Sequence, residues 1–159
     1  MIKLSHVDAR GRARMVDVTK KNSTLRVAVA RGKIAMRSKT LALIVAKKIE
    51  KGDVLTVARI AGIMAAKKTP DLVPMCHPLN ISSVGISLRP KKNPSRVEIE
   101  ATVKVTGQTG VEMEAMTAVS VCGLTIYDMC KAVDREMSIG GIQLVEKRGG
   151  KSGTFKRKG

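Results

Sequence analysis

Residues 115–127 constrain the fold more than any other stretch, because none of them is charged. Their side chains are small or apolar on every face of a helix, which is typical of a buried helix. Just upstream, Thr109-Gly110-Val111-Glu112 has the spacing of a capping box. We therefore predict a long helix that begins there and ends near Met137. The uncharged stretch is too short to span a bilayer.

The remaining elements alternate between strand and helix patterns. Strands are expected at 15–18, 25–36, 81–88, 96–106 and 139–145, and helices at 40–46, with Ser38 as N-cap, and from 53 or 56 to 68. Leaving out the short first strand, the order is strand, helix pair, strand, strand, helix, strand. This order predicts a ferredoxin-like βαββαβ fold of the α+β class, with helices packed on one face of the sheet.

The chain of 159 residues is expected to form a single domain, 1–159. Residues 1–12 are predicted to be a mobile arm, and residues 148–159 a flexible tail rich in Gly and Lys. With 43% apolar residues but only one Tyr, one Phe and no Trp, the core must be aliphatic. Three widely spaced cysteines imply no disulfide framework. The amino terminus has no apolar run, so we expect a cytoplasmic protein.

The formal charge of +17, from 30 basic and 13 acidic residues, favours anionic partners. A solvated basic surface accounts for most of these charges. Binding of single-stranded nucleic acid through stacked bases is disfavoured, because the aromatic platforms that it needs are missing. No membrane association is expected.

Asp128 and Lys131 are one helical turn apart and within reach of each other, and Glu114 falls on nearly the same face. Two interpretations are open. The pair is either an ordinary surface ion pair or, at the rim of a buried helix, a partly desolvated pair suited to proton transfer. Glu112 points elsewhere, so capping accounts for it.

Two further segments carry candidate chemistry. In Met75-Cys76-His77-Pro78, the proline favours an extended backbone at His77, which suits either a satisfied loop histidine or one that contacts phosphate or moves protons. Cys76 beside it hints weakly at zinc or a thiol–imidazole pair, although no C-x-x-C motif is present.

Residues 149–153, Gly-Gly-Lys-Ser-Gly, look like the end of a P-loop, but Val145 stands where that motif needs glycine. The loop is either a disordered basic tail or, with Lys147 and Lys151, a flexible loop that wraps around a phosphate chain.

At these residues the sequence resembles the cyclic pyranopterin monophosphate synthase family, also called molybdenum cofactor biosynthesis protein C. The matching runs lie at 15–18, 51–54, 58–63, 74–79, 109–115, 124–133 and 149–153. The Cys76-His77-Pro78-Leu79 and Tyr127-Asp128-Met129-Cys130-Lys131 runs are the most specific of them. Together the runs cover nearly the whole chain in family order.

The resemblance implies a lyase of molybdenum cofactor biosynthesis. Its substrate would be (8S)-3′,8-cyclo-7,8-dihydroguanosine 5′-triphosphate, and its products cyclic pyranopterin monophosphate and diphosphate. It also implies a homohexamer, built as a trimer of dimers, with the active site at the dimer interface. No resident cofactor or metal is implied, and Mg²⁺ would at most accompany the triphosphate.

Carried over by position, the resemblance assigns roles to eleven residues. Asp128 and Lys131 are catalytic with Lys51 as their partner. The predicted substrate-binding residues are Met75, Cys76, His77, Glu112, Met113, Glu114, Arg26 and Lys147.

Two other functions compete with this one. A basic nucleic-acid-binding protein would bind duplexes with an affinity that falls steeply with salt. A non-catalytic assembly module of the same fold would show no turnover, and a thermal-shift response to a guanosine triphosphate would separate it from the other two.

Overall fold

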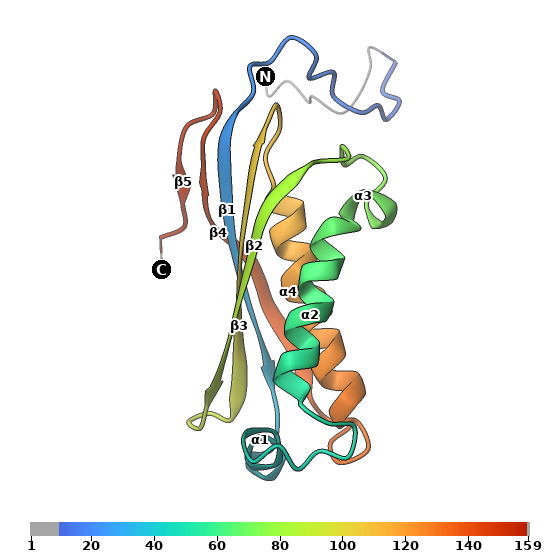
Figure 1. Ribbon diagram of the computed structural model, residues 1–159, viewed down its shortest axis with the longest axis vertical. Helices are drawn as coiled ribbons and strands as arrows, with labels where there is room; N and C mark the ends of the chain where they lie inside the picture. The colour runs from blue at the N-terminus through green and yellow to red at the C-terminus, as the bar shows by residue number, and fades with distance from the viewer. Residues whose placement is uncertain (1–9, 159) are drawn as a thin grey trace.

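The computed structural model describes residues 10–158, which form one antiparallel sheet and four helices (Figure 1). The strands are β1 (Thr24–Ala35), β2 (Ile81–Lys91), β3 (Arg96–Gly107), β4 (Ser138–Arg148) and β5 (Phe155–Lys156). The helices are α1 (Ser38–Val45), α2 (Val54–Lys67), α3 (Thr69–Leu72) and α4 (Glu112–Cys130). No helix within the described residues is long and apolar enough to cross a membrane.

The strand order β2-β3-β1-β4-β5, with antiparallel neighbours throughout, confirms the predicted ferredoxin-like arrangement. β1 pairs with β3 on one side and with β4 on the other, so the first and last strands of the βαββαβ unit are neighbours. Figure 1 shows α2 and α4 lying along one face of the sheet, with α1 and α3 near its opposite ends. The helices therefore cover one face, as expected.

The core lies between this face and the two long helices. Alternate residues of β3, from Val97 to Val105, are at most 1% exposed, because a strand turns every second side chain to the same face. On α4, Ala118, Val119 and Cys122 are fully buried, whereas Leu124 is 58% exposed. The uncharged stretch is thus buried on most of its circumference but leaves one strip at the surface.

Gly62 of α2 allows the two long helices to approach closely. A Cβ atom at this position would overlap the Cys122 sulfur of α4 and lie 3.1 Å from the Ala118 carbonyl oxygen. The Cys122 thiol also donates to the Ala58 carbonyl oxygen at 3.2 Å. The missing side chain at Gly62 therefore sets the spacing between α2 and α4.

We expect Gly62→Ala to lower the free energy of unfolding by about 1 to 3 kcal/mol, because the added methyl group overpacks a core that cannot yield locally. The matched control is Gly85→Ala on β2, where a Cβ would meet only the Thr102 carbonyl oxygen at 3.9 Å. Urea unfolding followed by circular dichroism should separate the two variants. Equal midpoints for both would contradict this account of helix spacing.

Several predicted boundaries were wrong. Thr109 does not cap α4, because Val111 is the N-cap residue, and the helix ends at Cys130 rather than near Met137. Ser38 is the first residue of α1 and Arg37 its N-cap. In contrast, Asp53 does cap α2, accepting a hydrogen bond from the Thr56 amide.

The two ends of the chain also differ from the predictions. Residues 14–18 form no strand, so the short strand predicted at 15–18 was wrong. Residues 1–9 of the predicted arm lie outside the described residues. Within the tail, β5 pairs with β4 through Glu146 and Lys147. The flexibility of residues 148–159 stays a prediction.

Candidate active site

Helix α4 divides the predicted site residues into two groups at its opposite ends. Glu112 to Glu114 lie in its first turn, and Asp128 lies in its last. Glu114 and Asp128 are therefore about 21 Å apart along the axis, at about 1.5 Å per residue. Glu114 and Asp128 were predicted to lie on nearly one face of the helix. That prediction describes only their angle around the helix axis, and the distance along the axis keeps the two side chains apart in one chain.

The group at the carboxyl end of α4, the carboxyl-end cluster, consists of Lys51, Asp128 and Lys131. The Lys131 Nζ atom lies 2.7 Å from Asp128 Oδ1, across the one turn that the spacing predicted. Lys51, from the loop between α1 and α2, donates to Asp128 Oδ2 and to the Asp128 carbonyl oxygen, each at 3.0 Å. One carboxylate thus holds two ammonium groups together.

Of the two interpretations that the sequence left open, the single chain shows the exposed ion pair. The side chains of Asp128 and Lys131 are 57% and 53% exposed in the single chain. Hydrogen bonds from Lys131 and Lys51 hold the pKa of Asp128 below its ordinary value. The hydrogen bond to Asp128 raises the pKa of Lys131. Near neutral pH the single chain therefore presents Lys131 as a protonated amine beside a carboxylate.

The group at the amino end of α4 lines a hollow, the amino-end pocket. Its walls include Met75, Cys76 and His77 from the connector and Glu112, Met113 and Glu114 from α4, six of the residues predicted to bind substrate. Sequence reasoning missed six further lining residues: Val16, Val18, Lys21, Leu79, Thr109 and Gly110. Val16 and Val18 were assigned to a strand and Thr109 to a cap, although all three belong to the family-like runs.

Glu114 is only 2% exposed, and burial raises its pKa, as does the nearby Glu112 carboxylate. Burial, with a contribution from Glu114, also raises the pKa of Cys76. A thiol with a raised pKa is poorly ionised near neutral pH, which disfavours the nucleophilic thiol–imidazole interpretation of Cys76.

The ring of His77 is fixed by the amino-terminal segment. Its Nε2 atom lies 2.7 Å from the carbonyl oxygen of Val16, which can only accept, so Nε2 carries the proton in this contact. This hydrogen bond satisfies one ring nitrogen.

Lys147 connects the amino-end pocket to the glycine loop 149–153, and Arg26 lies against the same loop. Lys147 lies 3.1 Å from Glu112 and 3.3 Å from the Ser152 hydroxyl. Arg26 donates through Nε to the Gly107 carbonyl oxygen at 2.9 Å, and its guanidinium covers Gly150, where a Cβ would overlap it. Glu112 therefore pairs with Lys147 beside the pocket, and the predicted capping role was wrong.

Comparison with known proteins identifies the family. Residues 15–150 match the family described as MoaC. The chain belongs to the MoaC family. It is 63% identical to a protein named cyclic pyranopterin monophosphate synthase from Pelotomaculum thermopropionicum, over 98% of this chain and 92% of the relative. It is 61% identical to the protein of that name from Roseiflexus sp. RS-1, over 98% of both chains.

The MoaC match spans every candidate site residue, from Arg26 to Lys147. Between residues 10 and 158, no three His, Cys, Asp or Glu side chains gather into a group that would hold a metal ion. The expectation of no resident cofactor stays a prediction. Among the described residues, Cys76 and His77 belong to no such group of three, so the structure does not support the zinc site that the sequence suggested.

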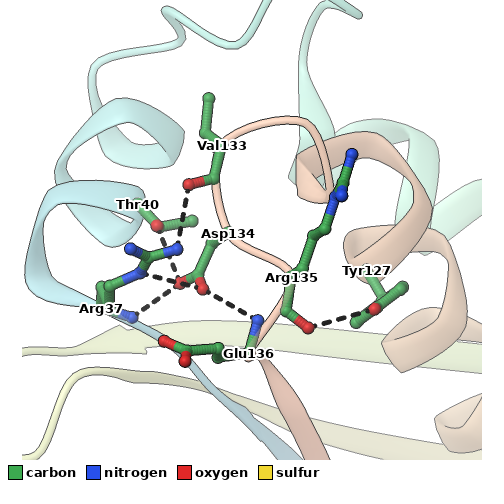
Figure 2. A network of polar contacts seen from close by, with 7 residues as sticks. All are labelled: Arg37, Thr40, Tyr127, Val133, Asp134, Arg135 and Glu136. Atoms are coloured by element: carbon green, nitrogen blue, oxygen red, sulfur yellow. Dashed lines mark hydrogen bonds and ion pairs between the residues drawn. The ribbon is translucent and has the colours of Figure 1, made fainter.

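One charged network near the carboxyl-end cluster was not foreseen from the sequence (Figure 2). Asp134, 1% exposed, accepts hydrogen bonds from the Arg37 amide at 2.9 Å, from Arg37 Nε at 3.0 Å and from the Thr40 hydroxyl at 3.0 Å. The Glu136 amide donates to it at 3.2 Å, and the Tyr127 hydroxyl donates to the Arg135 carbonyl oxygen at 3.2 Å.

This network gives stability a predictable pH dependence. Burial raises the pKa of Asp134, but hydrogen bonds from Arg37 and Thr40 outweigh it and hold the pKa below its ordinary value. The stability that Asp134 contributes is then complete above its unfolded pKa of about 3.9 and is lost as pH falls through its folded pKa. We expect the difference in free energy of unfolding between wild type and Asp134→Asn to shrink below about pH 4. Urea titrations at pH 7, 4 and 3 measure it, and a difference that grows toward pH 3 would contradict the prediction.

Proposed function

We propose that this protein is a cyclic pyranopterin monophosphate synthase. It converts (8S)-3′,8-cyclo-7,8-dihydroguanosine 5′-triphosphate to cyclic pyranopterin monophosphate and diphosphate, as a cytoplasmic lyase of molybdenum cofactor biosynthesis. The single observation that carries this proposal is the high identity to synthases over nearly the full length of both chains. The candidate site adds chemical support, because it combines clustered cations with titratable groups.

The reaction makes two demands on these residues. Closing the cyclic phosphate joins the α phosphorus to a second sugar oxygen and breaks its bond to the oxygen that leaves with diphosphate. The leaving group gains negative charge, which fixed cations stabilise. Lys51 and Lys131 are the cations of the carboxyl-end cluster, and Arg26 and Lys147 are those beside the amino-end pocket.

Ring opening and pterin closure also require proton transfers. Asp128 raises the pKa of Lys131 and so keeps it protonated near neutral pH, which makes the ammonium a proton donor to a group that becomes strongly basic during the reaction. Glu114 has a raised pKa and His77 has one ring nitrogen held by Val16, so each is suited to exchange protons with the base or the sugar. The place of Met75, Cys76 and Met113 in the pocket wall supports substrate-binding roles for them.

A complete site requires both groups, so we place it between two protomers. A two-fold axis crossing α4 near its midpoint would run the two α4 helices antiparallel. The amino-end pocket of one protomer would then face the carboxyl-end cluster of its partner. The strip that would lie at this contact is Met113, Thr117, Val121 and Leu124, which are exposed or half-buried. It contains no charge, so pairing would desolvate no ion along its length.

Such pairing also accounts for the exposure of Asp128 and Lys131 in a single chain. Their burial would increase when the partner's pocket covers them, and the partly desolvated pair, one of the two interpretations that the sequence left open, would form in the assembly. Three such dimers would make the proposed homohexamer. The assembly binds a small nucleotide-derived substrate rather than nucleic acid or a membrane, with Mg²⁺ at most accompanying the triphosphate.

The test is incubation of the purified protein with the cyclic guanosine triphosphate substrate. We expect equimolar release of diphosphate and of a pterin product, measured by a coupled phosphate assay and by chromatography with fluorescence detection. Substrate recovered unchanged, together with duplex DNA binding that weakens steeply with salt, would favour the nucleic-acid-binding alternative instead.

A further inference from the structure

Asp134 makes contacts that link two segments of the proposed site without touching either group of site residues. Its own amide and that of Val133 both donate to the carbonyl oxygen of Cys130, the last residue of α4, at 3.1 and 2.9 Å. The turn that carries Asp134 is therefore fixed to the end of α4, next to Asp128 and Lys131.

The other partners of Asp134 lie at the start of α1. The Arg37 amide and the Thr40 hydroxyl belong to the N-cap and first turn of this helix, and both point to Asp134 in Figure 2. The loop after α1 is tight, with the Lys48 amide donating to Leu43 and the Gly52 amide donating to Ile49. Lys51 lies within this loop, so its backbone position depends on where α1 sits.

Two sets of contacts therefore join the segment that contains Lys51 to the end of α4. One is the ion pair between Lys51 and Asp128, whose side chains are 49% and 57% exposed. Exposed ion pairs fix geometry poorly, because water screens them and long side chains lose entropy on pairing. The other is the Asp134 network, in which Asp134 and Thr40 are buried, Arg37 is exposed, and the Asp134 carboxylate accepts four hydrogen bonds. A buried carboxylate that is satisfied by several hydrogen bonds gives rigidity that the exposed pair lacks.

The structure assigns to Asp134 the role of a positioning residue, which sets the distance between Lys51 and the Asp128–Lys131 pair. This inference rests on the proposed function for its catalytic consequence, but the geometry that it describes is independent of any substrate. Asp134 itself contacts no part of the carboxyl-end cluster through its side chain, so it acts only through the backbone of the two segments.

The decisive variant is Asp134→Asn, which keeps the shape of the side chain but removes its charge and one acceptor oxygen. We expect kcat for diphosphate release to fall about tenfold, since small displacements of reacting groups are costly. KM should change less than twofold, because the amino-end pocket is untouched. The control is Val103→Ala in the centre of β3, a fully buried core residue whose truncation also destabilises the fold.

A second readout needs no turnover. The Asp128 carboxyl titration, followed by carbon NMR, reports how closely Lys51 and Lys131 approach, since their hydrogen bonds lower its pKa. In Asp134→Asn we expect this pKa to rise toward its ordinary value, and in Val103→Ala we expect no change. If Asp134→Asn does not fold, Thr40→Val removes a single hydrogen bond and should move kcat and the titration in the same direction.

The outcomes separate the two hypotheses. Wild-type protein without turnover would defeat the proposed function, while the Asp128 titration would still test the positioning role. A folded Asp134→Asn variant with wild-type kcat and an unchanged Asp128 titration would overturn the inference. A fall in kcat shared equally by Val103→Ala would overturn it as well, because the loss would then follow from stability alone.

Discussion

Lys131→Ala is expected to lower kcat for diphosphate release about 1,000-fold, within the range typical of a missing acid–base group. Removing the ammonium takes away a proton donor and half of the cationic pair that Asp128 holds. The unfolding midpoint should not change, because the side chain is about half exposed. Single-turnover measurements with saturating substrate separate this chemical defect from weakened binding.

The control for this experiment is Lys48→Ala. Lys48 is an exposed lysine from the same loop region as Lys51, and it is not part of either group of site residues. If turnover depends on positive charge in general, both variants should lose similar activity. If it depends on the carboxyl-end cluster, only Lys131→Ala should be impaired. Normal turnover by Lys131→Ala would remove the basis for the proposed catalytic role.

The fold was predictable where one periodic pattern dominates. β3 alternates strictly, and its Val and Ile residues all reach the core, so both the strand and its buried face follow from the sequence. The ends of the helices were harder to predict, because capping depends on tertiary contacts. Glu112 has the right spacing to cap, yet Lys147 lies within reach and pairs with it instead.

The carboxyl end of α4 illustrates the same limit. Residues compatible with a helix continue past Cys130, but α4 ends there. The chain turns because the Asp134 carboxylate accepts hydrogen bonds from Arg37 and Thr40. Nothing in the local sequence shows that a carboxylate will meet partners 94 or more residues away. The one feature of the sequence that could have indicated this network is a charged residue, Asp134, just after a buried helix.

The candidate site was predictable in part. The contact between Asp128 and Lys131 follows from helix geometry alone, and the structure shows it. Lys51 was found only through the family resemblance, since its contact with Asp128 joins residues distant in sequence. Glu114 and Asp128 belong to the same helix, but the distance along its axis keeps them apart. Because one chain does not bring the two groups of site residues together, we place the complete site between two protomers.

A site shared between protomers makes a strong prediction for mixed assemblies. His77→Ala removes a group from the amino-end pocket, and Lys131→Ala removes one from the carboxyl-end cluster. Each variant should be inactive alone, because all its sites carry the lesion. In a random mixture half of the dimers are hybrid, and each hybrid has one site with both lesions and one with neither. Coexpression should therefore restore roughly a quarter of wild-type activity.

The matched control mixes Lys131→Ala with Asp128→Asn. Both lesions lie in the carboxyl-end cluster, so every site of every hybrid dimer still contains one of them, and no activity should return. Recovery in the first mixture but not in the second requires that the two ends of α4 serve different sites. If neither mixture regained activity although mass spectrometry showed hybrid oligomers, His77 and Lys131 would have to act within one chain. That outcome would contradict the shared site, because one chain would then have to bring together two groups whose α4 members, Glu114 and Asp128, lie about 21 Å apart along the helix axis.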